Sequence, residues 1–243
     1  MYLENVVMDA VDPGLVGRFW EQALGGSNLT RDPDSYETRV KVDGGPVLDV
    51  CVQQVPVPPA EPLRLHLDLS PGGDQEATVE RLLGLGARHL DIGQGDVPWV
   101  VMADPEGTPF CVMEERAAYA ASGPVAALPL DSSDPDRDAR LWGLLSGWTD
   151  VDGPAGGAPR SLRHPSGLGP LLELCPEPAR KDVGAKNRIH LDIRLQSGDD
   201  PREVRARILG LGGRDHEHDW GPLPWQVYRD GSGNELCVLP ARD

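Results

Sequence analysis

Hydrophobic and polar residues alternate in several short runs separated by Gly and Pro, and this pattern predicts β-strands. The clearest runs in the first half of the chain are residues 38–42, 46–53, 64–69 and 99–102. Ahead of them, Leu15, Phe19 and Ala23 recur at intervals of four and predict a helix. Asp12 is its expected N-cap, Pro13 fits its first turn, and a Gly-Gly pair ends it. This half of the chain therefore mixes strands with helices.

The same order of elements occurs again in the second half of the chain. RLHLDLSPGGDQEATVERLLGLGAR is repeated as RIHLDIRLQSGDDPREVRARILGLGGR, and PWVVMADPEGTPFCVME as PWQVYRDGSGNELCVLP. His66 and His190 occupy the same place in the repeat, 124 residues apart (190 − 66). The repeat indicates a duplication, and each half contains the order strand, helix and strands twice. We therefore predict an α+β fold of two tandem domains, residues 1–117 and 123–243, each built from two βαβββ units.

The strand at residues 64–69 and its copy carry the main candidate binding residues. Alternation places the leucines of the first copy on one face of the strand and polar side chains on the other. The apolar face has to pack against helices, so the polar face is expected to line a concavity, where small molecules commonly bind. The polar residues of the two copies are Arg64, His66, Asp68, Arg188, His190 and Asp192.

Two further features of the repeat bear on binding. Trp99 and Trp225 each follow a proline at the start of a strand, where they are expected either to stack on a flat ligand or to pack in the core. Asp68 and Asp192 are expected to orient the neighbouring histidine or to pair with an arginine. The segments at residues 104–107 and 216–218 are interpreted as a turn and a solvated turn, respectively.

Composition and charge narrow the choice of partners. Asp and Glu number 39 against 23 Lys and Arg, which gives a formal net charge of −16 and a pI near 4.7. A field of this sign repels nucleic acid and anionic membranes, so neither is an expected partner. The chain shows no secretory signal and no membrane-spanning run, and a cytoplasmic location is expected. The four cysteines form no CxxC pair, so disulfides and a cysteine-rich zinc site are not expected.

The Asp-Pro helix start, the His-Leu-Asp strand and the turn before the last strand occur in both halves. In these features the chain resembles the vicinal oxygen chelate superfamily, which includes glyoxalases, bleomycin-resistance proteins and extradiol dioxygenases, and most closely its actinobacterial glyoxalase-like subgroup. The resemblance implies curved, half-open sheets with helices outside, and a small-molecule ligand. It also implies either a monomer, in which the fused domains form a pseudo-dimer, or a homodimer.

Enzymes of this superfamily hold a divalent metal with residues from the first, fourth, fifth and eighth strands of each site. The resemblance places these positions at Asn5 and Ala127, at Gln53 (or Asp49) and Glu173, at His66 and His190, and at Cys111 and Cys237. The implied ligands for zinc, iron, manganese or nickel are therefore His66, Cys111, His190, Glu173 and Cys237. Because alanine cannot coordinate a metal and three firm ligands are needed, binding without a cofactor is favoured.

Taken together, the sequence favours a glyoxalase-like protein that binds or sequesters an aromatic or apolar metabolite or antibiotic without a metal. Its binding residues are expected to be the polar strand residues with the two tryptophans, Gln53 and Asn5. The alternative is a divalent-metal-dependent lyase, isomerase or dioxygenase, in which His190, Glu173 and Cys237, or His66 with Cys111, would bind the ion. Because a site of this fold can be assembled from strands of both halves, His66 could also act together with Glu173. A third hypothesis, a partner-binding module without a ligand, predicts a filled concavity and an exposed apolar patch.

Overall fold

The computed structural model describes residues 1–58, 62–151, 160–177, 186–218 and 221–242, and it shows four successive βαβββ units. Unit 1 consists of β1 (Tyr2–Ala10), α1 (Pro13–Leu24), β2 (Ser27–Asp32), β3 (Ser35–Lys41) and β4 (Val47–Gln54). Unit 2 consists of β5 (Asp68–Leu69), α2 (Gln75–Gly84), β6 (Arg88–His89), β7 (Val100–Ala103) and β8 (Pro109–Val112). A short 3-10 helix, η1 (Ala117–Tyr119), follows.

The second half of the chain contains two units with the same order of strands and helix. Unit 3 consists of β9 (Val125–Ser132), α3 (Pro135–Ser146), β10 (Thr149–Val151), β11 (Arg160–Arg163) and β12 (Leu171–Pro176). Unit 4 consists of β13 (Ile189–Arg194), α4 (Pro201–Gly210), β14 (Arg214–Asp215), β15 (Gln226–Arg229) and β16 (Glu235–Leu239). The predicted α+β fold with a tandem repeat of βαβββ units is confirmed.

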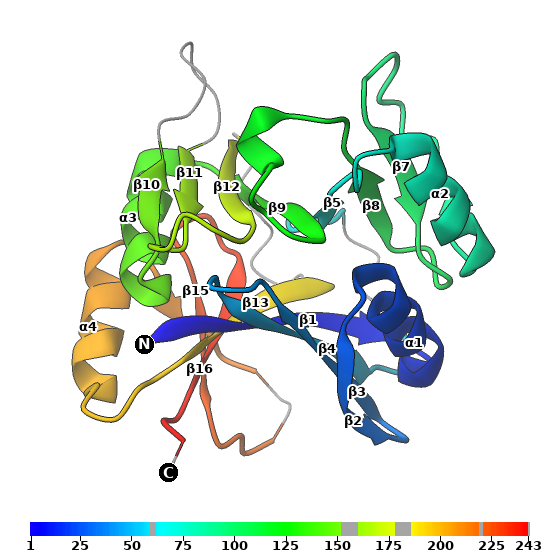
Figure 1. Cartoon of the computed structure of the whole chain (residues 1–243). Helices are drawn as coiled ribbons and strands as arrows, with labels where there is room; N and C mark the ends of the chain where they lie inside the picture. Colours follow the sequence, from blue (N-terminus) through cyan, green and yellow to red (C-terminus); the bar gives the residue numbers. More distant parts are fainter. Residues whose placement is uncertain (59–61, 152–159, 178–185, 219–220, 243) are drawn as a thin grey trace.

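The units pair across the two halves of the chain, forming two eight-stranded sheets (Figure 1). Sheet A has the order β14-β15-β16-β13-β1-β4-β3-β2, so it joins unit 4 to unit 1 through antiparallel β1 and β13. Sheet B has the order β10-β11-β12-β9-β5-β8-β7-β6 and joins unit 3 to unit 2 through β9 and β5. Each sheet therefore contains one unit from each half of the chain.

The first helix begins as the sequence predicts, and it buries the predicted Phe19 and Ala23 but not Leu15. The Asp12 side chain accepts a hydrogen bond from the backbone N–H of Leu15, and Gly25 ends the helix at a positive φ of 62°. The predicted stripe was wrong at Leu15, which is 41% exposed. The buried stripe begins one residue later, at Val16, and continues through Phe19, Trp20 and Ala23, which is the spacing of one helix face.

The main core lies between the two sheets and the helices. The predicted alternation is confirmed: Leu65, Leu67 and Leu69 are buried in this core, and Ile189, Leu191 and Ile193 of the copy are buried with them. The histidine and aspartate of each strand face the other way, toward the outer face of the sheet, whereas the arginines contact the opposite sheet. In the described part of the chain, no helix is long and apolar enough to cross a membrane.

A tryptophan-to-aspartate hydrogen bond links the two sheets within each half. Trp20 Nε1 of α1 donates to Asp104 Oδ2 over 3.3 Å, and Trp142 Nε1 of α3 donates to Asp230 Oδ2 over 3.2 Å. Asp104 also accepts the backbone N–H groups of Glu106 and Thr108. Residues 104–107 thus form the predicted turn, but its aspartate is fully buried and also fixes a helix of the other sheet.

One proline makes the two sheets differ where the halves meet. In sheet A, Val7 of β1 pairs with His190. The corresponding pair in sheet B is Pro129 and His66, in which the His66 N–H donates to the Pro129 carbonyl over 3.2 Å. Proline has no N–H to return a bond. As a result β5 is 2 residues long whereas β13 is 6, and the His66 side chain is 35% exposed against 9% for His190.

Candidate functional site

The outer face of sheet A, called face A, brings together polar residues from both halves of the chain. The strand register aligns Asp49, Asn5, Asp192 and Cys237 in one row across β4, β1, β13 and β16. The next row contains Cys51, Val7 and His190. Neighbouring residues in a row share a face of the sheet. The side chains of His190 and Asp192 on β13 therefore project into the same space as those of Asn5 and Val7 on β1.

Three donor groups are closely grouped on face A. His190 Nε2 lies 3.4 Å from Asp192 Oδ1 and 3.6 Å from Cys237 Sγ, and one donor atom of each residue lies within 4.8 Å of the others. All three residues are buried. Burial, followed by the negative charge of Asp192, raises the pKa of the Cys237 thiol well above its ordinary value, so without a metal this thiol keeps its proton.

An open pocket lies over these residues. One part has a volume of about 390 Å³ and is lined by His190, Cys237, Trp225, Leu223 and other residues. An adjoining part of about 360 Å³ shares His190, Cys237 and Trp225 and extends to Asn5 and Asp192. We call the two parts together pocket A. Its size is that of a small-molecule site, and its floor is the polar row described above.

Basic side chains around pocket A are held by buried acidic ones. Arg39 makes a bidentate contact with Asp49, with distances of 2.8 and 2.6 Å. Lys186 pairs with Asp9, whose other oxygen accepts a hydrogen bond from the Gln53 amide over 2.8 Å. Such pairs compensate the cost of burying each carboxylate.

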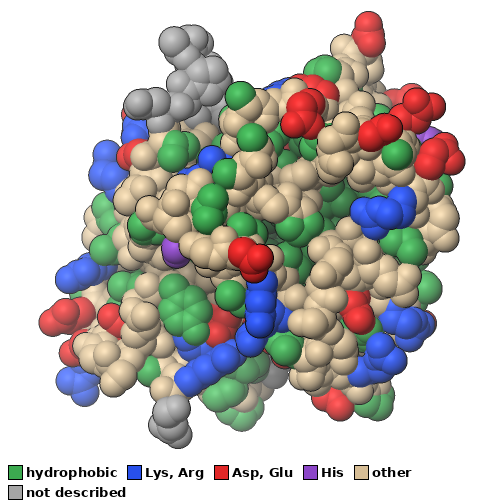
Figure 2. Space-filling view, in the orientation of Figure 1, with side chains coloured by type: hydrophobic (Ala, Val, Ile, Leu, Met, Phe, Trp, Pro, Cys, Tyr) green, Lys and Arg blue, Asp and Glu red, His purple; other side chains and the backbone are tan. Residues whose placement is uncertain are grey.

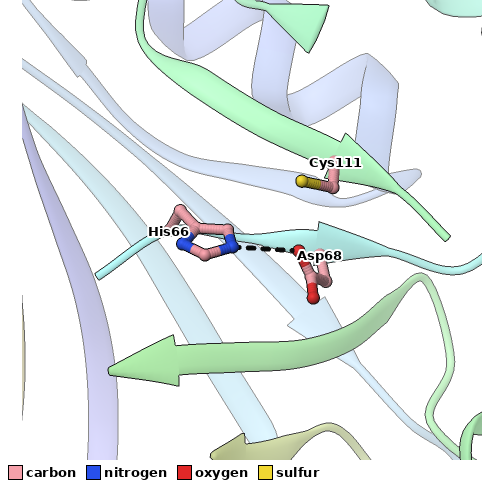
Figure 3. A group of neighbouring side chains, drawn as sticks. All are labelled: His66, Asp68 and Cys111. Atoms are coloured by element: carbon pink, nitrogen blue, oxygen red, sulfur yellow. Dashed lines mark ion pairs between the residues drawn. The ribbon is translucent and has the colours of Figure 1, made fainter. Parts of the chain in front are cut away.

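The outer face of sheet B, called face B, repeats the trio but not its surroundings. His66 and Asp68 lie side by side with Cys111 of the neighbouring strand (Figure 3), and His66 Nε2 is 3.2 Å from Asp68 Oδ1. The row through Asp68 continues to Ala127 and Leu171. These two apolar residues stand where face A has Asn5 and Asp49, so face B lacks two polar groups of the row.

A segment between the two halves covers face B. Tyr119 of η1 packs with Cys111, Ala127, Leu171 and other residues in a separate apolar cluster, against which Trp99 also packs. The Arg116 guanidinium lies 5.6 Å from the centre of the Tyr119 ring. Arg163 donates to the Ala118 carbonyl over 2.6 Å and so holds the segment in place. Face B is therefore occupied by the chain itself where face A is open.

Glu173 lies on face B, in the row of Pro129 and His66. Burial, followed by the charge of Asp68, raises its pKa from about 4.5 to about 7. Burial lowers the pKa of His66, but the hydrogen bond and charge of Asp68 outweigh burial, and the net shift is upward. Glu173 thus lies beside His66 on face B. The predicted grouping of Glu173 with His190 and Cys237 is wrong, because Glu173 lies in sheet B and the other two residues lie in sheet A.

The structure also places the remaining predicted residues. Trp225 and Gln53 line pocket A, but the residue of unit 1 that occupies the position of Glu173 is Cys51 rather than Gln53. Arg64 and Arg188 lie where the halves meet: Arg64 Nε donates to Asn234 Oδ1 over 3.1 Å, and Arg188 contacts the Glu106 carbonyl over 3.5 Å.

The segment at residues 216–218 is less solvated than predicted. The His216 backbone N–H donates to the Val227 carbonyl, and its side chain, 14% exposed, lies 3.8 Å from Glu235. The rings of His216 and His218 are 6.3 Å apart. Within the described residues, the compact groups of three metal-type donors are the two trios on faces A and B, so this histidine pair belongs to neither.

Sequence reasoning missed Tyr119, Lys186 and Asp9 as residues of the two faces. Tyr119 lies in an Ala- and Ser-rich segment that resembles a linker, and its isolated aromatic ring is the one signal that indicates packing. Lys186 forms an ion pair with Asp9 because unit 4 lies beside unit 1 in sheet A. Charged side chains of both signs are distributed over the surface shown in Figure 2, so surface charge alone would not have located either face.

Two eight-stranded sheets, each joined from two βαβββ units around a polar row, define a protein of the vicinal oxygen chelate fold. The family model described as the glyoxalase-like domain matches residues 5–113 and 127–239, and the chain belongs to this family, with two copies of the domain. No curated protein sequence matches the chain.

Solved structures share this fold at low sequence identity. A putative dioxygenase from Bacillus subtilis is 15% identical, with a TM-score of 0.62, over 100% of this chain and 86% of that one. The V278E mutant of glyoxalase I from Zea mays is 14% identical, with a TM-score of 0.68, over 98% of this chain and 92% of that one. At these identities the similarity shows the fold alone.

Proposed function

We propose that the protein binds a small aromatic or apolar molecule in pocket A, without a metal ion, and sequesters it there. The observation that carries this proposal is the difference between the two faces. Pocket A is open and combines the apolar side chains of Trp225 and Leu223 with the polar groups of His190 and Cys237. On face B, the corresponding space is packed with Tyr119 and its neighbours.

The composition of pocket A suits this role. A partly buried indole offers a large flat surface for stacking and keeps a polar edge, and a few polar groups on the floor fix the orientation of a ligand. His190 is buried and its Nε2 contacts Cys237 Sγ at 3.6 Å, so its ring is positioned before a ligand arrives. Side chains that are ordered in advance lose little entropy on binding, which favours affinity.

We expect a probe of suitable size to stabilise the protein through pocket A. The probes are 1-naphthalenemethanol, 1-naphthylmethylamine and 1-naphthoate, and binding of any of them raises the melting temperature. Trp225→Ala and His190→Ala are expected to remove most of this shift, whereas Trp99→Ala and His66→Ala, the matched changes on face B, leave it. Failure of all three probes to bind, or equal losses in both sets of variants, would refute the proposal.

A second candidate function is supported by the compact donor trio on face A. Nitrogen, oxygen and sulfur donors from His190, Asp192 and Cys237 lie within 4.8 Å of one another, and this donor set fits zinc. Asp192 Oδ1, the oxygen that faces His190 Nε2, is buried without a hydrogen-bond partner among the described residues, as a metal-ligating oxygen would be. A bound ion would polarise an oxygen of the ligand and stabilise negative charge on it.

Elemental analysis separates the two candidates. For protein purified without chelator, the metal-free proposal predicts less than about 0.1 equivalent of any transition metal, since three buried donors would retain a zinc ion. One equivalent that is lost in Cys237→Ser and kept in Cys111→Ser would instead establish a metal site on face A. The serine variants keep the size of the side chain, so the comparison tests the sulfur donor rather than the packing.

A further inference from the structure

Two oxygen atoms on the floor of pocket A have no hydrogen-bond partner among the described residues. Asn5 Nδ2 donates to Asp192 Oδ2 over 3.0 Å, which fixes the amide and leaves its oxygen on the other side. Asn5 Oδ1 and Asp192 Oδ1 are both buried without a hydrogen-bond partner. The two residues are only 8% and 6% exposed, and both line the pocket. Leaving such atoms unpaired is costly, so their presence requires an explanation.

Within the described part of the chain, the Asp192 carboxylate has no lysine or arginine as an ion-pair partner. Among the described residues, Asp49 is held by Arg39 and Asp9 by Lys186. The group paired with Asp192 is the imidazole of His190, at 3.4 Å and without hydrogen-bond geometry. A buried negative charge in this position favours a positively charged guest, and the net charge of −16 attracts cations to the protein as a whole.

From these observations we infer that pocket A takes a ligand carrying a protonated amino group, which donates hydrogen bonds to Asn5 Oδ1 and Asp192 Oδ1. The inference rests on the proposed function and adds the chemical class of the ligand. An ammonium group supplies several N–H donors from one atom, so it can satisfy both oxygens at once. Trp225 lines the same part of the pocket and offers an aromatic ring either to the body of the ligand or to its charge.

Face B shows that this arrangement is not a general feature of the repeat. Ala127 takes the place of Asn5 and Leu171 the place of Asp49, while Asp68 is kept. The chain therefore contains its own comparison, a trio with the same carboxylate but without the second acceptor. It also shows that alanine is accepted at this position of the fold.

The test compares isosteric probes on protein that has first been treated with chelator. By calorimetry at pH 7.5, 1-naphthylmethylamine is expected to bind at least about ten times more tightly than 1-naphthalenemethanol, and 1-naphthoate less tightly than either. Asp192→Asn and Asn5→Ala are each expected to reduce the preference for the amine to threefold or less. Asp68→Asn, the same change on face B, is expected to leave the preference intact.

The outcomes are distinguishable from failure of the proposed function. Equal binding of the amine and the alcohol, lost in Trp225→Ala, would overturn the ammonium inference and keep the proposed function. If no probe binds, the proposed function falls and takes the inference with it. Stoichiometric uptake of zinc that is lost in Asp192→Asn, without any preference for the amine, would assign the two acceptors to a metal and overturn the inference. Because Ala127 occurs naturally in the repeat, Asn5→Ala remains informative if Asp192→Asn does not fold.

Discussion

Replacement of Trp142 by alanine is expected to lower the free energy of unfolding by about 3–5 kcal/mol. The Trp142 side chain is 1% exposed and packs in the core between the sheets. Its loss leaves a large cavity and also removes the donor to the buried Asp230 carboxylate. Urea denaturation of the variant and the wild-type protein measures the difference.

The first half of the chain offers a matched comparison for this prediction. Trp20 makes the corresponding bond to Asp104, so Trp20→Ala is expected to have an effect of similar size. Trp142→Phe keeps much of the packing but loses the N–H, and about 1–3 kcal/mol is expected for that change. A loss below 1 kcal/mol in Trp142→Ala would show that the link between α3 and the β15–β16 turn does not stabilise the fold as argued.

Glu173→Gln is expected to stabilise the protein at pH 8 by up to about 3 kcal/mol and to have little effect near pH 4.5. The pKa of Glu173 is raised in the folded protein, so folding favours the protonated form. The stability contributed by that proton is fully present below pH 4.5, the usual value, and is lost as the pH rises through about 7. Glutamine is neutral throughout, so the variant avoids this loss.

Denaturation curves of both proteins at pH 5 and pH 8 test this prediction. Glu80→Gln, on the exposed side of α2, serves as the control for removing one negative charge from an acidic protein. That variant is expected to change stability by less than about 0.5 kcal/mol at either pH. A gain for Glu173→Gln that is the same at both pH values would contradict the raised pKa.

Local structure follows from the sequence because its causes are local. The cap at Asp12, the left-handed Gly25 and the alternation around His66 depend on neighbouring residues only, and the structure confirms each of them. The prediction for α1 is confirmed at Phe19 and Ala23 and wrong at Leu15, which fits the helical spacing equally well but lies at the exposed edge of the stripe. Which apolar residue faces the core depends on the sheet beneath the helix, and the sequence does not contain that information directly.

The pairing of the units could not be predicted from the repeat. All four units have the same order of elements, so joining unit 1 to unit 2 or to unit 4 satisfies the same hydrophobic pattern. The actual pairing decides the composition of both faces: it brings Asn5 to Asp192 and separates Glu173 from Cys237. The pairing of the units therefore decides which of the predicted site residues share a face.

The difference between the faces was also hidden in the sequence. Pro129 is a single residue in an otherwise apolar strand, and its missing N–H matters only because His66 lies opposite. Tyr119 belongs to a segment outside the repeat, so it has no corresponding residue in the second half of the chain. Both residues act through contacts that form only after the units have paired.

Because both halves belong to one chain, face A and face B can change separately. In a symmetric pair of identical chains, every substitution appears at both sites at once. Here positions 5 and 127 are the same position of the repeat but lie in different sheets, so asparagine can serve one face while alanine serves the other. A single polypeptide can therefore keep the pocket on face A open while face B packs against another part of the same chain.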